Sequence, residues 1–423
     1  MQSTVRGTLS VLRSLLAYTV VACAYFGTLV VCRMSRLAPR RPWTPTRRIV
    51  VTATFFNTQW FLSHVIPLTR SGVDEVIVVT DQPLVALDKV RFWCPAHGMS
   101  RLIGRAVSKF ACLLACGLYL KPDVLIGFHL FPGAISALIV ARVLGRPACY
   151  QMTGGPIEIV GGGAYSENRL LAKLGRGSRL LESLAIAVVR EFDLVVVRGS
   201  KARAFLIDRG VRPVTVITGS VTFLSEPAAP DREYDLVFVG RLAAIKQPLQ
   251  FVDIVASLRR QLPTVRAAVV GDGPLLNAAR ERAIALGIEQ SIDFLGQIQD
   301  VERILTRSKV FVLTSQSEGL SIAMAEAMAA GVVPVVADVG DLGDLVIDGV
   351  TGFLVKPDSV SEFTHRAALL LQDPTLWARQ SHAATEAASR QTSLDVVTAK
   401  WTESLSRLVA TSTNSPGADE KRL

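Results

Sequence analysis

Two acidic side chains in the last third of the chain have the surroundings expected of a ligand site. Between Gly319 and Gly331 (GLSIAMAEAMAAG) the only ionisable side chain is Glu326, and Glu318 comes directly before this run. A carboxylate among alanine and methionine side chains is costly to bury unless a partner pairs with it. Two neighbouring hydroxyl groups, such as those of a ribose, would be suitable partners. The alternative is a solvent-facing glutamate on an alanine-rich helix.

The residues around this pair predict a strand, a polar turn, a helix and a second strand, over residues 309–314, 315–319, 320–330 and 332–337. In such a unit the helix begins beyond the carboxyl edge of a parallel sheet. Its first turn carries unpaired N–H groups and a partial positive charge, and both attract anions. The pattern therefore favours an anionic ligand at the start of this helix.

Another predicted strand, over residues 235–239, ends in groups suited to phosphate. Gly240 and Arg241 follow it directly, and Lys246 stands five residues further on. A guanidinium with forked donors and a mobile ammonium together suit a diphosphate. The alternative is a salt bridge between domains.

A glycine-containing turn follows the predicted strand 266–270. Its Gly271 and Gly273, in the sequence VGDGP, would let a ring or a phosphate approach the backbone closely, but a full dinucleotide-binding fingerprint is missing. Residues 348–355 predict a hairpin-like turn and a strand with a structural role. Because the carboxyl ends of parallel strands share one edge, we expect these strand ends to converge on one crevice.

Length and charge favour two domains, one of them near an anionic surface. The chain has 423 residues and a net charge of +10, half of its residues are hydrophobic, and 19% are charged. Residues 33–210 contain 24 Lys/Arg and 11 Asp/Glu, or +13, whereas residues 211–423 contain 20 and 25, or −5. Nucleic acid is a weaker explanation, because the basic residues are scattered and no nucleic-acid motif accompanies them. The six cysteines lack metal-ligand spacing, so we expect reduced, packing cysteines.

An apolar segment near the N-terminus predicts a membrane helix. Leu15 to Cys32 is eighteen residues without a charge, just long enough to span a bilayer. The heavier positive flank is C-terminal, at Arg33, Arg36, Arg40, Arg41, Arg47 and Arg48, which would keep the rest of the chain on the cytoplasmic side. One alternative is a helix lying in the membrane interface, and another is a cleaved signal peptide.

Strands that alternate with helices predict two doubly wound parallel sheets in series. The first sheet would use strands at 49–53, 75–80, 124–128, 148–152 and 194–197, and the second would add 293–296 to the strands named above. We therefore expect a tail over 1–14, a membrane helix over 15–32, a Rossmann-like domain over 46–225, a linker at 226–230, a second Rossmann-like domain over 231–392, a helix over 393–410 and a disordered tail over 411–423.

This order of motifs resembles the retaining glycosyltransferases of family four. These enzymes have the GT-B architecture, in which two Rossmann-like domains face a central cleft. The resemblance covers roughly residues 120 to 405. It is carried by 317–319 (SEG) and 326–331 (EAMAAG), 334–337 (PVVA), 348–352 (DGVTG), 240–242 (GRL) with Lys246, and 122–124 (PDV) leading to His129.

The resemblance implies a role for each candidate residue. Arg241 and Lys246 would hold the diphosphate, helped by backbone N–H groups near Gly319, Leu320 and Ser321. Glu326 would hold the ribose, Glu318 and His129 would contact the transferred sugar, and the Gly271–Pro274 turn and the region of Gln297 would line the base. Without the resemblance, a lone histidine at a strand end would be read as structural.

The first half departs from the family pattern in two places. Residues 55–58 (FFNT) stand where the family has a Gly-Gly loop, and glycines appear later, at 153–156 (TGGP) and 161–163 (GGG). The later glycines indicate either an acceptor subgroup or a mobile loop. Basic residues at Arg101, Arg105, Lys109, Arg169, Lys173, Arg176 and Arg179 are either solvated faces or contacts with anionic lipid headgroups.

The resemblance implies a retaining transferase without a cofactor, and the lack of an Asp-x-Asp pair at a strand end favours a reaction that needs no metal ion. The donor would be a nucleotide-diphosphate sugar. The acceptor would be a lipid-linked glycan on a polyprenyl diphosphate, or another glycolipid, at the cytoplasmic side of the inner membrane, in surface polysaccharide assembly. One alternative is a catalytically silent sugar-nucleotide-binding scaffold. The other is a nicotinamide-dependent enzyme, which should show a glycine fingerprint near its first strand.

Overall fold

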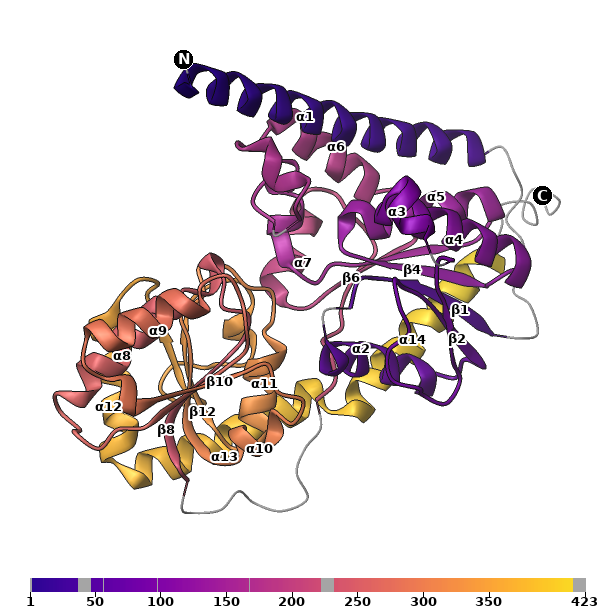
Figure 1. The fold of residues 1–423 in the computed structure, drawn as a ribbon. Coiled ribbons are helices and arrows are strands. Elements are labelled where there is room, and N and C mark those ends of the chain that lie inside the picture. Colours follow the sequence, from indigo (N-terminus) through magenta and orange to yellow (C-terminus); the bar gives the residue numbers. More distant parts are fainter. Residues whose placement is uncertain are drawn as a thin grey trace. The chain divides into compact units, whose positions relative to one another are not determined.

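The computed structural model of the chain divides into two compact units (Figure 1). The first comprises Met1–Ile217 and Thr398–Leu423, and the second comprises Thr218–Val397. The structure describes residues 2–36, 47–55, 57–96, 98–166, 168–221 and 232–413. The predicted linker, Arg40, Arg41 and Phe56 lie outside the described residues.

Seven parallel strands form the sheet of the first unit, in the order β3-β2-β1-β4-β5-β6-β7. The strands are β1 (Arg48–Thr52), β2 (Glu75–Val79), β3 (Val90–Trp93), β4 (Val124–Phe128), β5 (Ala148–Gln151), β6 (Leu194–Val197) and β7 (Val214–Val216). The helices are α1 (Gln2–Ser35), α2 (Thr58–Arg70), α3 (Met99–Ile103), α4 (Arg105–Leu120), α5 (Ile135–Leu144), α6 (Arg179–Val189) and α7 (Ser200–Asp208). The short helical turns are η1 (Leu130–Ala134), η2 (Gly155–Glu158), η3 (Val160–Gly162) and η4 (Leu171–Leu174).

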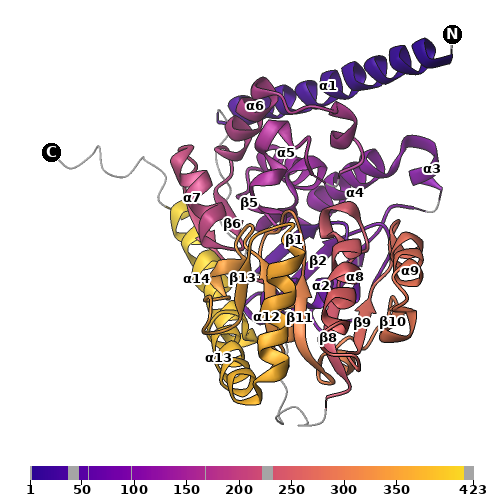
Figure 2. The ribbon, with the colours of Figure 1, turned by 90° about the vertical axis from the view of Figure 1, so that its left-hand side faces the viewer.

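Six parallel strands form the sheet of the second unit, in the order β10-β9-β8-β11-β12-β13. The strands are β8 (Tyr234–Val239), β9 (Ala267–Val270), β10 (Ile292–Gly296), β11 (Ser308–Leu313), β12 (Val333–Ala337) and β13 (Phe353–Val355). The helices are α8 (Pro248–Arg259), α9 (Leu276–Ala285), α10 (Glu302–Leu305), α11 (Ile322–Ala329), α12 (Val360–Gln372), α13 (Pro374–Thr392) and α14 (Leu394–Thr413), and the turns are η5 (Ala244–Lys246), η6 (Glu289–Ser291) and η7 (Leu342–Asp344). Helices α8 and α12 pack against each other beside this sheet (Figure 2).

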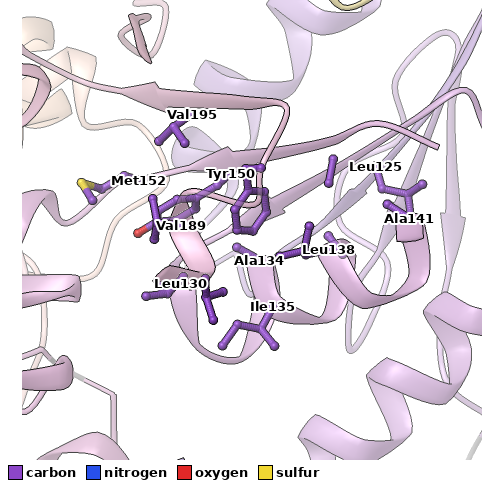
Figure 3. Packing of buried hydrophobic residues seen from close by; sticks show 14 of the residues in the cluster. Leu125, Leu130, Ala134, Ile135, Leu138, Ala141, Tyr150, Met152, Val189 and Val195 are labelled. Carbon is purple, nitrogen blue, oxygen red and sulfur yellow. The ribbon is translucent and has the colours of Figure 1, made fainter. Parts of the chain in front are cut away.

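Apolar side chains of strand and helix interlock in each unit. In the first unit α5 packs on β4 and β5, with Leu138 and Ala141 near Leu125 and Tyr150 (Figure 3). Every residue of β4 is buried, as expected for a central parallel strand covered by helices on both faces. The expected pair of Rossmann-like α/β sheets is therefore confirmed.

The strands that the sequence pattern did not indicate lie at sheet edges. Both β3 and β7 pair on one side only, and most of their residues are half-buried. They consequently lack the continuous apolar run that marks the central strands. Residues 348–355 form a turn and then β13, which pairs in parallel with β12, so this segment is not a hairpin.

The C-terminal helix returns to the first unit. Helix α14 begins in the second unit, and from Thr398 onward the chain belongs to the first unit, where Trp401, Leu405 and Leu408 are buried. The helix continues to Thr413, three residues into the segment expected to be disordered, and residues 414–423 lie outside the described residues.

Candidate active site

The carboxyl ends of β8 and β11 meet in the middle of the second sheet. The chain proceeds from β8 to β9 and β10 on one side and from β11 to β12 and β13 on the other. This reversal of strand order is the place where open α/β sheets bind ligands. All the site residues predicted in this unit follow β8, β9, β10 or β11 at this edge of the sheet.

The loop after β8 is held by the loop after β11. The Thr314 hydroxyl donates to the carbonyl oxygens of Lys246 at 2.9 Å and Gln247 at 3.0 Å, and the Gln316 amide donates to the Ile245 carbonyl at 2.8 Å. These bonds fix the backbone that carries Lys246, while the side chain of Arg241 is exposed just after β8.

Lys246 and Glu318 form an ion pair between these two loops. The Lys246 ammonium contacts Oε1 of Glu318, and the Ser315 hydroxyl donates to the same oxygen at 2.7 Å. The two side chains are only 23% and 9% exposed, so their attraction is screened less than that of a surface pair. An ammonium has three donors, and the contact with Glu318 occupies part of that capacity. The structure thus brings a predicted phosphate ligand and a predicted sugar ligand together.

Helix α11 begins directly after this pair. Ser321 is its N-cap, and the Ser321 hydroxyl accepts a hydrogen bond from the Met324 amide at 3.3 Å. Gly319, Leu320 and Ser321 are buried, and they carry the backbone N–H groups that we expected to face an anion.

Glu326 lies one turn further along α11, half-buried among alanine and methionine side chains. Burial raises its pKa to about 7, and the nearby Glu302 carboxylate adds to the effect. Among the described residues, no ion pair or side-chain hydrogen bond engages the Glu326 carboxylate. This side chain is therefore not an ordinary solvent-facing glutamate, and a group that donates hydrogen bonds would lower the cost of its charge.

Glycines allow the strand-end loops to approach each other closely. Gly271 has a φ of 132°, and a Cβ there would lie 2.0 Å from the Gly240 carbonyl oxygen. A Cβ on Gly273 would lie 2.5 Å from the Leu242 carbonyl oxygen. The VGDGP turn is thus packed against the Gly240-Arg241-Leu242 segment, whereas Gln297 is exposed just after β10.

The analysis of motifs missed Gly340, which supports this site from the loop after β12. Gly340 has a φ of 53°, and a Cβ there would lie 2.0 Å from the Glu318 carbonyl oxygen. The following amide, of Asp341, donates to the Gly319 carbonyl at 3.3 Å. A glycine three residues beyond a predicted strand was the only signal, and it did not indicate which backbone lies opposite.

His129 belongs to the first unit and follows β4 directly. It has a φ of 54°, which is uncommon for a residue other than glycine. Its side chain is 33% exposed, and the Trp60 ring stacks on the imidazole with 5.9 Å between ring centroids and an angle of 16° between planes.

The buried partner of His129 is Glu158, a second residue that the motif analysis missed. Oε1 of Glu158 lies 3.2 Å from Nδ1 of His129, and Glu158 is only 5% exposed. Burial alone would raise the pKa of Glu158, but the His129 interaction and hydrogen bonds from Gly154 and Tyr150 outweigh it and lower the pKa below the ordinary value. Glu158 stands two residues beyond the TGGP stretch, whose role the sequence left open, and its carboxylate accepts from the amides of Thr153 and Gly154 in that stretch.

The loop at residues 55–58 is aromatic where the family has glycines. The Phe55 ring packs against Trp60, Phe61 and Phe128, with centroids 5.0 to 5.8 Å apart. The Asn57 side chain caps α2 by accepting from the Trp60 amide at 2.7 Å.

Comparison with known proteins places this geometry in a family. Residues 222–390 match the model of the family "Glycosyl transferases group 1". The Vi polysaccharide biosynthesis protein VipC/TviE of Salmonella typhi is 36% identical over 117 residues, which are 28% of this chain and 20% of that protein. The D-inositol 3-phosphate glycosyltransferase of Mycobacterium sp. (strain KMS) is 36% identical over 165 residues, or 36% of each chain.

A solved structure shares the fold over most of the chain. Anabaena Alr3699/HepE in complex with UDP-glucose superimposes with a TM-score of 0.69 at 19% identity, over 85% of this chain and 99% of that one. The curated relatives are matched over a smaller share, from 20% to 53% of their own length for the first three. The second unit therefore matches the glycosyl transferases group 1 family over residues 222–390, and the chain has the GT-B fold of two Rossmann-like domains.

Proposed function

We propose that the protein transfers a sugar from a nucleotide-diphosphate donor to a hydroxyl group of a glycan acceptor, with retention of anomeric configuration. The main support is the arrangement at the β8–β11 edge, where Lys246, Glu318 and the start of α11 lie together in a unit of the glycosyl transferases group 1 family. The complexes of HepE with UDP and UDP-glucose support a nucleotide sugar as the donor.

In this proposal the second unit stabilises the leaving group. Departure of the sugar builds negative charge on the diphosphate, and Arg241, Lys246 and the N–H groups before α11 would neutralise it without a metal ion. Glu326 would accept hydrogen bonds from the two ribose hydroxyls, and Gly271, Gly273 and Gln297 would line the base.

His129 and Glu318 would act on the transferred sugar. His129 would form a hydrogen bond to a sugar hydroxyl, and Glu318 would accept from others while remaining paired with Lys246. The positive charge that develops on the sugar ring would be favoured by the Glu318 carboxylate.

The proposed acceptor is a lipid-linked glycan, on a polyprenyl diphosphate or another lipid, in the assembly of a surface polysaccharide. Relatives named for Vi polysaccharide biosynthesis and for exopolysaccharide phosphotransfer support the polysaccharide class. The apolar helix α1, which over Val11–Ser35 has the length and composition of a membrane span, supports a lipid-linked acceptor at the cytoplasmic side of the inner membrane.

Substitution of the two best-supported ligands tests the function. Lys246→Ala and Glu326→Ala should each lower transfer at least about 100-fold, because each removes a group that holds the donor. Thermal-shift measurements with UDP, GDP, ADP and NAD should show stabilisation of the wild type by a nucleoside diphosphate. Stabilisation by NAD alone would favour the nicotinamide enzyme, and full activity of either variant would refute the assigned residue.

A further inference from the structure

Helix α1 is packed lengthwise on the first unit. Ala17, Val21, Tyr25 and Cys32 are buried in the core that α5 and α6 share, and they form one stripe along the helix. Figure 1 shows α1 lying along α5 and α6, and η4 also contacts it.

Polar contacts attach α1 to the unit at Ser14 and just past its last residue, at Arg36. The Ser14 hydroxyl donates to the Lys173 carbonyl at 2.9 Å, and Arg36 pairs with Glu191 at 2.6 Å. Between Ser14 and Arg36 an α-helix rises about 33 Å, which equals the ~30 Å thickness of the hydrocarbon layer of a bilayer. The unit therefore accompanies α1 over a full membrane thickness.

The opposite face of α1 is exposed and mainly apolar from Val11 to Met34, with Thr19 and, near its end, Arg33 among the apolar positions. Its large side chains are 41% to 67% exposed, at Val11, Leu12, Leu15, Leu16, Val20, Phe26, Val30 and Met34. The exposed Cys23 stands seven residues from both Leu16 and Val30, and hence on the same face. An apolar face of this length is unusual for the surface of a soluble protein.

Exposed cations occur on α1 and on a segment that contacts it. Arg13 and Arg33 are on α1, and Arg169, Lys173, Arg176 and Arg179 occur in and around η4, which contacts α1. None of the residues of α1 is acidic. Apolar side chains next to cations are complementary to a bilayer with anionic headgroups.

We propose that α1 lies in the plane of an anionic membrane, with its exposed face in one leaflet, rather than crossing it. A crossing helix would carry the unit packed along it into hydrocarbon, including the irregular backbone of η3, whose Gly162 carbonyl accepts from the Tyr25 hydroxyl near the middle of α1. Separating α1 from the unit instead would uncover the apolar surface of α5 and α6. The sequence left spanning and in-plane binding open, and the packing decides between them.

A depth profile along α1 tests the orientation. Single fluorescent labels are placed at Cys23 in a Cys94→Ser background, and at Leu12→Cys, Leu16→Cys, Val30→Cys and Met34→Cys in a background that also carries Cys23→Ser. Each label is quenched by spin labels at known depths in anionic vesicles. An in-plane helix gives the same shallow depth at all five positions. A depth that reaches the bilayer centre at Cys23 and returns to the surface at both ends would overturn the proposal, as would labels that never enter lipid. Neither result bears on sugar transfer.

Charge substitutions test the lipid partner. Binding to anionic vesicles should weaken by about fivefold per residue in the triple variant Lys173→Gln, Arg176→Gln and Arg179→Gln. Added salt should weaken vesicle binding by the wild type in the same way. The matched control is Lys356→Gln, Arg379→Gln and Arg390→Gln on the second unit, which should bind like the wild type. Equal affinity of the two triple variants would refute the basic surface beside α1.

A separate observation concerns Glu158. Its two oxygens accept hydrogen bonds from the amides of Leu130, Thr153 and Gly154 and from the Tyr150 hydroxyl, at 2.6 to 3.1 Å, besides facing Nδ1 of His129. With so many donors the carboxylate is ionised, and an ionised carboxylate can only accept. Nδ1 of His129 must therefore carry the proton between them.

The other neighbour of the ring does not select a tautomer. The Thr153 hydroxyl lies 3.0 Å from Nδ1 and 3.3 Å from Nε2 of His129, and a hydroxyl can donate or accept. Together with the stacked Trp60 ring, Glu158 fixes both the orientation and the protonation of the imidazole.

We infer that Glu158 is a positioning residue that holds His129 in the Nδ1–H form, so that Nε2 accepts a hydrogen bond from a sugar hydroxyl. This inference rests on the proposed function for the role that His129 plays in sugar transfer. The contact between Glu158 and His129 does not depend on that function.

Nitrogen-15 chemical shifts of His129 test this directly, with the resonance assigned from His129→Gln. The wild type should show a protonated Nδ1 at neutral pH, and Glu158→Gln should populate the other tautomer. Thr153→Ala is the control and should leave the tautomer unchanged. A wild-type proton on Nε2 alone would overturn the inference.

Activity provides the second readout. Glu158→Gln should lower kcat about tenfold or more without changing the affinity for nucleotide. If Glu158→Gln were fully active while His129→Gln was inactive, the positioning role of Glu158 would be refuted and the proposed role of His129 would stand. Full activity of His129→Gln would instead refute the role that the proposed function gives His129.

Discussion

At the scale of single residues, the candidate site contains two carboxylates in opposite situations. Glu318 is paired with Lys246, whereas the Glu326 carboxylate is held in apolar surroundings that raise its pKa to about 7. Near neutral pH, Glu326 is therefore about half protonated before any ligand arrives, and its full charge depends on the donors that a ligand supplies.

The raised pKa of Glu326 makes stability depend on pH. The folded chain holds this proton up to about pH 7 and the unfolded chain only to about 4.5, so the group lowers stability progressively as pH rises between these values. In urea unfolding, the free energy of unfolding of Glu326→Gln should match that of the wild type at pH 4.5. At pH 8 it should exceed the wild-type value by up to roughly 3 kcal/mol. An equal difference at both pH values would contradict the assignment.

The same ionisation affects binding. A nucleotide sugar should bind the wild type more tightly at pH 8 than at pH 6, because only the carboxylate accepts two hydroxyl donors. Glu326→Gln should remove this pH dependence, which calorimetry at the two pH values would measure.

How far the site was predictable depends on what each residue shows locally. Glu326 and Lys246 were identifiable because a charge in an apolar helix, or just after a strand, is a local signal. Glu158 gave no such signal, because its significance arises from tertiary contacts with the ends of β4 and β5. The contact between Lys246 and Glu318, 72 residues apart, likewise follows from the pairing of β8 with β11.

At the scale of elements, the loops at the sheet edge are fitted to each other through glycine. Gly340 combines a positive φ with contact against the Glu318 carbonyl, so a side chain there would displace the segment that carries Glu318. The backbone of the loop after β12 thus helps to shape the site.

A pair of glycine substitutions separates the effect of the positive φ from the effect of the contact with the Glu318 carbonyl. Gly349 also has a positive φ, of 74°, but a Cβ there would meet nothing within 4 Å. Gly349→Ala should cost about 1 kcal/mol of stability, whereas Gly340→Ala should cost about 3 kcal/mol and lower nucleotide affinity. Equal losses in denaturant unfolding would show that the Glu318 contact is unimportant.

Elements with strong periodicity were the predictable ones. Buried strands such as β4 and β6 have the bounds that their apolar runs indicated, whereas β3 and β7 are too exposed to stand out. For α1 the sequence correctly indicated an apolar helix. It did not show that one stripe of that helix belongs to a protein core, because the partner residues on α5 and α6 are more than 100 positions away.

At the scale of the whole molecule, the first unit is made from two separate parts of the chain. Its sheet is complete at Val216, but residues from Thr398 onward also belong to it and bury Trp401, Leu405 and Leu408. Burial of three such side chains contributes roughly 5 to 9 kcal/mol, comparable with the total stability of a domain.

Removal of the returning segment should therefore affect the units differently. A chain that stops after Val397 should lose amide protection in β1 to β7, while the second unit keeps both its protection and its stabilisation by a nucleoside diphosphate. Hydrogen exchange with mass spectrometry would measure both units at once. Unchanged protection in the first unit would show that α14 does not support it.

This discontinuity has a consequence for biosynthesis. A ribosome that has finished the seven strands of the first unit must still translate some 180 residues before the segment that completes it emerges. During that interval α1 has already been released and is available to lipid, so membrane association can precede maturation of the unit that carries it. A premature stop codon near the 3′ end of the message would then leave an incomplete first unit at the bilayer together with a finished second unit.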